Sequence, residues 1–166
     1  MIVPNGARHP QTYLVIRHLR VHEAATLARL RATSFDRSEA SDADIDKAAR
    51  LLTEQLTWGE FVCVVAVDEG EIVSYGVGMI HQRLPTRRNP SGRWGYIQSM
   101  ETHPEWRRRG LARGVLDAML TWFREREVTG VSLVASAEGE PLYRQAGFTR
   151  DPFGEPLIRI DPGSSP

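Results

Sequence analysis

The sequence predicts a single α+β domain in which strands and helices alternate along the chain. Its 166 residues suit one domain, and the 41% that are hydrophobic can form a substantial core. Short apolar runs recur between stretches of helical periodicity, in the order β-α-α-β-β-β-α-β-α-β with a further strand near the C-terminus. There is no internal repeat and no second domain. Residues 1–10 and 162–166 are expected to be loose tails of the 1–166 domain.

Residues 12–17 form the first expected strand, and two helices follow it. The strand is rich in β-branched and aromatic residues. In 23–32 and 43–57, apolar residues recur every three or four positions, which is the spacing of a helix with one buried face. An acidic segment runs into the second helix. It could attract a cationic partner, although a charge run is more often solvated surface. Its carboxylates are Asp36, Glu39, Asp42, Asp44 and Asp46.

A hairpin is expected next, over residues 61–67 and 72–81. The four residues between these apolar runs, Asp68-Glu69-Gly70-Glu71, have the composition of a tight turn. The single cysteine, Cys63, lies in the first run, where we expect a small core residue rather than a nucleophile. Residues 84–92 contain two prolines and several arginines and are expected to form a mobile loop.

A strand over 93–102 then leads into a strongly amphipathic helix over 110–127. The turn between them reads Arg107-Arg108-Arg109-Gly110-Leu111-Ala112. A helix start presents free backbone N–H groups and a partial positive charge, and a glycine lets an anion approach the backbone. Three arginines add attraction at longer range. The position of this basic turn between strand and helix favours a phosphate site over solvated surface.

The rest of the domain is short strands around one short helix. Strands are expected over 131–135, near Phe148 and over 157–160, with the helix over 140–146.

Charge and hydropathy limit the classes of function that the chain could have. The 21 basic and 21 acidic residues balance, which argues against a dedicated nucleic-acid binder. No apolar run could cross a membrane, and the N-terminus lacks a signal-peptide core. We therefore expect a cytoplasmic protein that binds no nucleic acid and no membrane.

Two motifs, in this order, resemble those of the GNAT superfamily of N-acetyltransferases. Its phosphate loop reads Gln/Arg-x-x-Gly-x-Gly/Ala, and its later helix ends in Leu-Tyr-x-x-x-Gly-Phe. The matching positions here are Arg107, Gly110, Ala112, Leu142, Tyr143, Gly147 and Phe148. The resemblance is tight over residues 94–150 and covers the rest by element order. It implies a GNAT-type, three-layer α/β arrangement: a mixed, mostly antiparallel sheet flanked by helices, with the fourth and fifth strands splayed into a cleft.

The resemblance implies acetyl-CoA as acyl-donor cosubstrate and no metal. The pantetheine arm would lie between the splayed strands like an extra strand, bonded to the backbone of residues 100–102. Ser136 stands where many members have an asparagine that contacts the pantetheine or places a water. The residues implied in coenzyme binding are Met100, Glu101, Thr102, Arg107, Arg108, Arg109, Gly110, Leu111, Ala112 and Ser136.

The resemblance also implies direct attack of an amine on the thioester. Tyr143, at the family's tyrosine position, would be the general acid that protonates the leaving thiolate, since a phenol pKa of about 10 is close to that of a thiol. The alternative is a core tyrosine whose hydroxyl only satisfies a neighbour. A backbone N–H of Met100 or Thr102 would bind the developing oxyanion.

The general base is left open by the sequence. Tyr96 aligns with a glutamate that acts as base in some members, and Gln98 beside it cannot act as one. Alternation along the strand turns Glu101 to the opposite face from its two neighbours, which favours a solvated carboxylate. His81 and His103 titrate in the right range, yet a lone histidine near a strand end is more often structural. A water, or an amine that arrives neutral, would also serve.

The acceptor would be an amine of a small molecule, a peptide or a protein. The sequence leaves open whether the chain forms a homodimer. Arginines in and around the loop before the fourth strand could grip a carboxylate or the coenzyme's 3′-phosphate; they are Arg83, Arg87, Arg88 and Arg93. Two other classes of function share some of these features. One is an acyl-CoA-binding module of the same fold without turnover. The other, a nucleic-acid or dinucleotide binder, lacks a Gly-x-Gly-x-x-Gly fingerprint and a basic balance.

Overall fold

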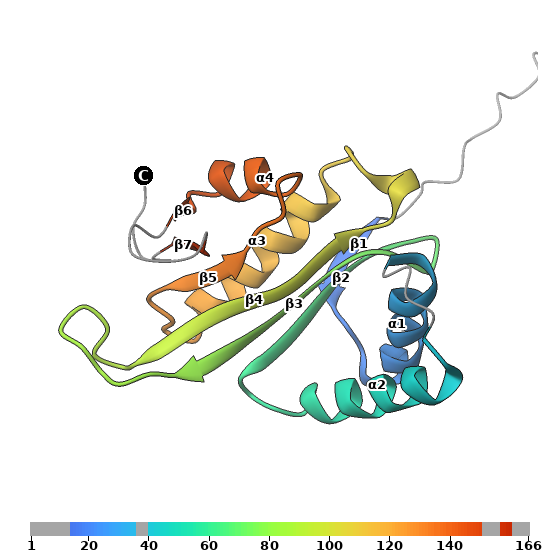
Figure 1. The fold of residues 1–166 in the computed structure, drawn as a ribbon, viewed down its shortest axis with the longest axis horizontal. Coiled ribbons are helices and arrows are strands. Elements are labelled where there is room, and N and C mark those ends of the chain that lie inside the picture. The colour runs from blue at the N-terminus through green and yellow to red at the C-terminus, as the bar shows by residue number, and fades with distance from the viewer. Residues whose placement is uncertain (1–13, 36–39, 151–156, 161–166) are drawn as a thin grey trace, which may run out of the picture.

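The computed structural model describes residues 14–35, 40–150 and 157–160. Within them a seven-stranded sheet has the order β1-β2-β3-β4-β5-β7-β6 (Figure 1). Neighbouring strands pair antiparallel except β4 and β5, which are parallel. The strands are β1 Val15–His18, β2 Phe61–Asp68, β3 Glu71–Gln82, β4 Arg93–Thr102, β5 Val131–Val134, β6 Thr149–Arg150 and β7 Leu157–Ile160. The expected mixed, mostly antiparallel sheet is confirmed. The two expected tails lie outside the described residues, and so do Asp36 and Glu39 of the acidic segment.

Helices cover both faces of this sheet. Figure 1 shows α1 and α2 on one side and α3 and α4 on the other. The first expected helix is shorter than its pattern, because a π-helical turn, η2, continues α1. The helices are η1 Val21–Glu23, α1 Ala24–Leu30, η2 Arg31–Phe35, α2 Asp42–Gln55, η3 Pro104–Trp106, α3 Leu111–Arg124 and α4 Glu140–Gln145. Among the described helices, no candidate for a membrane span is found.

Side chains of β2 alternate between two cores, one on each face of the sheet. The sheet and the helices on its two faces form three layers. Val62 and Val64 pack in the cluster that contains α3, whereas Cys63 and Val65 pack in the cluster that contains α1 and α2. Every residue of β2 is buried, so both faces of the strand are covered. Burial raises the pKa of the Cys63 thiol to about 12, which keeps it protonated. Cys63 is thus a core residue, as expected.

The strand β4 is bulged and parts from β5. Its register with β3 shifts at Gln98, which has no partner in β3. β5 pairs with β4 over the three residues from Gly95 to Ile97, whereas β4 continues to Thr102. In the described part of the chain, the last residues of β4 therefore keep one side of their backbone unpaired by β5. The expected splay of the fourth and fifth strands is confirmed.

The start of α2 explains part of the acidic segment. The Asp44 N–H donates to Ser41 Oγ at 3.2 Å, and the Asp44 carboxylate accepts from the Ser41 N–H at 3.2 Å and its hydroxyl at 2.6 Å. This is a capping box. Asp42 and Asp44 also lie in the first turn of α2, where the helix dipole favours negative charge. Both acids thus have a local structural reason to be here.

An ion pair links β1 to the turn before α1. Arg17 donates two hydrogen bonds to the Glu23 carboxylate, at 2.6 and 2.7 Å, and the Arg20 N–H donates a third at 2.9 Å. The bonds from Arg17 are the largest cause that lowers the pKa of Glu23, to about 2. Glu23 therefore stays charged in the folded chain at a pH where it would be protonated in the unfolded chain.

We expect Glu23→Gln to flatten the acid side of the stability profile. A carboxyl with a lowered folded-state pKa stabilises fully above its unfolded pKa, 4.5 for this glutamate, and loses that contribution as the pH falls toward 2. The parent's free energy of unfolding, from urea titrations at each pH, should therefore fall more steeply over this window than the variant's. Exposed Glu54→Gln is the control and should keep the parental slope. Parallel profiles of parent and Glu23→Gln would contradict this account.

Candidate functional site

The turn between β4 and α3 has the geometry of an anion site. Gly110 caps α3 in the left-handed region with φ 78°, and Arg108 is also left-handed with φ 63°. The first bond of the helix runs from the Gly114 N–H to the Gly110 carbonyl at 3.0 Å. The N–H groups of residues 111–113 therefore have no acceptor within the helix. A Cβ at Gly110 would meet no atom within 4 Å, so the space beside this glycine at the start of α3 is open.

Two of the three arginines differ sharply in their surroundings. Arg109 donates from Nη2 to the Glu105 carbonyl at 3.0 Å, and its guanidinium carbon lies 4.6 Å from the centre of the Trp106 ring. Arg108 is exposed, on the strained left-handed position of the turn. The charge of Arg108 is therefore free to approach an incoming anion, whereas that of Arg109 is held beside Trp106.

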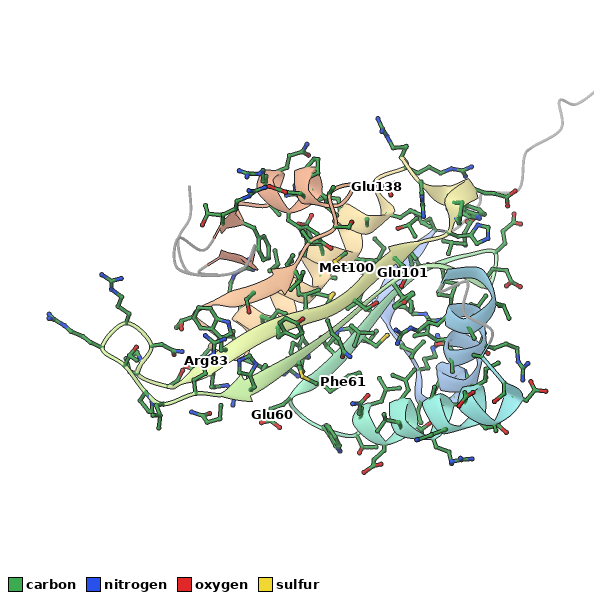
Figure 2. The ribbon with its side chains drawn as sticks, viewed as in Figure 1. Glu60, Phe61, Arg83, Met100, Glu101 and Glu138 are labelled. Atoms are coloured by element: carbon green, nitrogen blue, oxygen red, sulfur yellow. The ribbon has the colours of Figure 1, made fainter. Side chains whose placement is uncertain are left out.

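The third arginine, Arg107, bridges the two strands where they part. Its Nε donates to the Thr102 carbonyl at 3.2 Å, and its Nη1 lies 3.4 Å from a Glu138 carboxylate oxygen. Figure 2 shows Glu138 on the loop that leads into α4. Arg107 thus joins the end of β4 to the loop after β5, and it occupies a carbonyl that the sequence predicts for the arm.

Backbone groups of Met100 and Thr102 point away from β3. The His103 N–H donates to the Val73 carbonyl of β3 at 2.9 Å. Alternation along an antiparallel ladder then turns the N–H and C=O of residues 102 and 100 to the other side. On that side, β5 no longer pairs with β4. An extended chain could therefore add to this edge of β4 by backbone hydrogen bonds.

Glu101 belongs to the opposite face of the sheet from Met100. Its carbonyl accepts the Ser74 hydroxyl at 2.9 Å, and its carboxylate accepts the Tyr75 hydroxyl at 2.9 Å. Figure 2 labels Met100 and Glu101 at neighbouring positions of β4. The expectation of a solvated carboxylate is wrong, because a buried tyrosine on β3 reaches Glu101 across the strands. Since the Glu101 backbone also faces β3, the open edge of β4 is formed by the backbone of Met100 and Thr102 and not by that of Glu101.

Tyr143 lies in α4 with 8% of its surface exposed. Its ring meets Phe148 edge-on, with centroids 5.8 Å apart, and it belongs to the core cluster of α3. Burial raises the pKa of the Tyr143 hydroxyl. The hydroxyl therefore keeps its proton at neutral pH, as a proton donor must. A Cβ at Gly139 would lie 3.3 Å from the Tyr143 ring, so the loop before α4 packs closely on it.

Ser136 has a structural part in the same loop. Its Oγ accepts the Gly139 N–H at 3.2 Å, and its carbonyl accepts the N–H groups of Gly139 and Glu140 at 3.1 and 3.0 Å. These bonds form the turn that starts α4. The Ser136 side chain is exposed, and its hydroxyl is a hydrogen-bond acceptor within this turn.

His81 is engaged by the loop between β3 and β4. Arg83 donates from Nε to His81 Nε2 at 3.0 Å and stacks over Trp94, 4.2 Å from the ring centre. Partial burial first, and then the charge of Arg83, lower the pKa of His81. The loop itself is closed by hydrogen bonds between Thr86 and Asn89. Across the described ranges, no group of three or more His, Cys, Asp or Glu could hold a metal ion.

Sequence reasoning missed the contacts that reach across strands. Tyr75 reads as an ordinary aromatic residue of a buried strand, and Glu138 reads as loop surface. Tyr75 and Glu101 are 26 residues apart, and Arg107 and Glu138 are 31 residues apart. A buried tyrosine needs a partner for its hydroxyl, which is the one signal that pointed to the first pair. No feature of the nearby sequence indicates that Arg107 and Glu138 pair.

Comparison with known proteins finds a family and many structural relatives. A sequence model described as the acetyltransferase (GNAT) family matches residues 21–148. No curated protein sequence matches the chain. A crystal structure of a predicted acetyltransferase with acetyl-CoA, from Clostridium acetobutylicum, is 26% identical with a TM-score of 0.75. The match covers 86% of this chain and 94% of that one.

Two named acetyltransferases have the same fold at lower identity. Glucosamine-6-phosphate N-acetyltransferase from Arabidopsis thaliana is 20% identical with a TM-score of 0.69, over 86% of this chain and 96% of that one. An aminoglycoside acetyltransferase in complex with sisomicin, from an uncultured soil metagenomic sample, is 19% identical with a TM-score of 0.62. That match covers 81% of this chain and 85% of the other.

Proposed function

Because this chain belongs to the acetyltransferase (GNAT) family, we propose that it moves the acetyl group of acetyl-CoA to a primary amine of a small molecule, peptide or protein. The proposal rests on the junction of β4 and α3. There, the last residues of β4, whose backbone β5 does not pair, lead into the start of α3, where the first N–H groups have no acceptor within the helix. A single ligand with a phosphate group and an extended arm would use both. The Clostridium relative, crystallised with acetyl-CoA, supports this ligand.

The N–H groups at the start of α3 would hold the pyrophosphate, with the exposed Arg108 of the same turn as a further positive charge. The edge of β4 at Met100 and Thr102 would bind the arm. The Thr102 carbonyl, which accepts one bond from Arg107, has a second lone pair for the arm. The residues of this proposed binding surface are Met100, Thr102, Arg107, Arg108, Arg109, Gly110, Leu111, Ala112 and Ser136.

Tyr143 would be the general acid of the transfer. The amine nitrogen bonds to the thioester carbonyl carbon, and the carbon–sulfur bond breaks as the sulfur takes the proton of the Tyr143 hydroxyl. Burial, which raises the pKa of Tyr143, keeps that proton in place until the thiolate forms. A backbone N–H of Met100 or Thr102 would donate to the carbonyl oxygen as it gains charge.

Amine-dependent release of free thiol from acetyl-CoA tests this function. The panel would contain alkylamines, amino sugars and peptides with a free N-terminus, each with a control lacking protein. We expect release above the control with at least one amine class, and acetylated amine in the same sample. Tight acetyl-CoA binding by calorimetry without release for any class would identify a binding module of the same fold and overturn the proposal.

We expect Arg108→Ala and Arg109→Ala to differ although each removes one charge from the same turn. Arg108→Ala should weaken acetyl-CoA binding several-fold, and more at about 0.01 M than at about 0.15 M salt, because screening shortens from ~30 Å to ~8 Å. Arg109→Ala should weaken it less, since Glu105 and Trp106 hold that guanidinium. Calorimetric titrations at both salt concentrations measure the difference. A loss for Arg109→Ala equal to or above that for Arg108→Ala would assign the phosphate contact to Arg109.

A further inference from the structure

Polar side chains of β3 and β4 meet on the sheet face that α1 and α2 cover. The Tyr75 hydroxyl donates to Glu101 Oε1 at 2.9 Å and lies 3.3 Å from Ser99 Oγ. Tyr75 is fully buried and belongs to the core cluster of α1 and α2. Arg31, from η2, lies with its guanidinium carbon 5.6 Å from the centre of the Tyr75 ring. The Glu101 carboxylate is therefore fixed on this face of β4 by a hydroxyl that cannot leave the core.

We infer that Glu101 receives the proton of the acceptor's ammonium group, and that Tyr75 positions its carboxylate for this step. The inference rests on the proposed function and names the acceptor class: a basic primary amine that arrives as a cation. A carboxylate can accept about four hydrogen bonds, so the bond from Tyr75 leaves room for an ammonium donor. The pair would bind the cation and hold the oxygen that takes its proton.

Packing on the other face of β4 determines the direction of approach. The Met100 side chain packs in the core cluster of α3, so that face is filled beside the proposed thioester position. The backbone of residues 100 and 102 points along the sheet to the side that β5 leaves. An amine that reaches a carbonyl held there comes from the remaining face, where Glu101 lies between these two residues in sequence.

The proton balance of the step is complete. The ammonium gives one proton to the Glu101 carboxylate, and the freed lone pair bonds to the carbonyl carbon. The carbon–sulfur bond breaks, and the sulfur takes the Tyr143 proton. The nitrogen's second proton restores Tyr143, directly or through water, and Glu101 returns its proton to solvent. Ammonium and thioester thus give amide, thiol and one free proton.

Two amines of different basicity test the role of Glu101. An alkylamine, with a pKa of about 10, is a cation at about pH 7, whereas methoxyamine is largely neutral there. Glu101→Gln should lower kcat for the alkylamine about 10²- to 10⁴-fold and leave kcat for methoxyamine nearly unchanged. Its alkylamine rate should rise with pH as free amine forms in solution. The guanidinium carbon of Arg31, 5.6 Å from the centre of the Tyr75 ring, brings a positive charge to this pair.

Tyr75→Phe and Glu101→Asp are independent variants for the same measurement. Tyr75→Phe frees the carboxylate and should lower the alkylamine kcat by less than Glu101→Gln, again sparing methoxyamine. Glu101→Asp keeps the charge on a shorter side chain. It should also lower the alkylamine kcat by less than Glu101→Gln and spare methoxyamine. Exposed Glu71→Gln is the charge-matched control and should behave as the parent. Thermal melts and calorimetric acetyl-CoA affinity of each variant separate loss of fold or of coenzyme binding from loss of proton transfer.

Equal losses for both amines, or no loss for the alkylamine, would overturn the inference and make Glu101 a structural partner of Tyr75. Failure of the proposed function looks different, because the parent itself would then acetylate neither amine. If Glu101→Gln does not fold, the ratio of alkylamine to methoxyamine rates in Tyr75→Phe decides, and an unchanged ratio rejects the inference.

Discussion

Tyr143→Phe should lower kcat about 10²- to 10⁴-fold and leave acetyl-CoA affinity near the parental value. The substitution removes the hydroxyl that would protonate the leaving thiolate, and general acids contribute about this much. The ring keeps its edge-on contact with Phe148 and its place in the core of α3. The loss should therefore appear in turnover and not in the fold.

Steady-state kinetics, paired with thermal melts of the same preparations, measure this effect. Tyr96→Phe is a matched control, because it removes a phenolic hydroxyl from β4 without touching α4. It should keep parental turnover. A structural Tyr143 would give the reverse pattern, with a lower melting temperature and parental turnover per folded molecule, since a satisfied hydroxyl is worth about 1 kcal/mol of stability. Parental kcat in Tyr143→Phe would move the general acid to a water or another residue.

Gly110→Val should weaken acetyl-CoA binding by at least about tenfold, which is ~1.4 kcal/mol. The φ of 78° at Gly110 disfavours a β-branched residue, so the turn must change its backbone to accept valine. A side chain at this position would also fill the open space beside the start of α3. Both effects act on the phosphate site. Calorimetric titration with acetyl-CoA measures the loss.

Gly70→Val separates the two consequences of that substitution. Gly70 lies in the β2–β3 turn with φ 89°, and a Cβ there would also meet nothing within 4 Å. Valine at Gly70 therefore imposes similar backbone strain far from the phosphate turn. It should lower the melting temperature and keep acetyl-CoA affinity. If Gly110→Val binds acetyl-CoA as the parent does, or Gly70→Val loses as much affinity, the phosphate assignment is wrong.

Much of the fold could be predicted because its signals are local. The expected bounds of β4 and β7 agree with the structure, since each is a β-rich run with clear ends. The helix α3 was expected from its apolar face, and the turn at Gly110 from its position between strand and helix. The helix after β1 ends early because a π-helical turn replaces its last residues, and periodicity alone does not distinguish the two.

The candidate site was predicted less completely, because its contacts join distant segments. The sequence placed Glu101 on the correct face but in solvent, because nothing near it in sequence indicates the Tyr75 hydroxyl 2.9 Å away. The three arginines look equivalent in sequence. Backbone strain at Arg108, the ring under Arg109 and the carboxylate beside Arg107 make them different. Such differences come from tertiary packing, which the local run of three arginines does not reveal.

A single-turnover reaction with excess protein over acetyl-CoA distinguishes direct transfer to the amine from transfer through an acetylated protein. After mixing with an accepted amine, free thiol and acetylated amine are measured together over time, alongside the intact mass of the protein. Direct transfer predicts one acetylated amine for each thiol released, at the same rate, with no acetyl group gained by the protein. Thiol release without acetylated amine, or a protein that acquires the acetyl group before the amine does, would contradict the account.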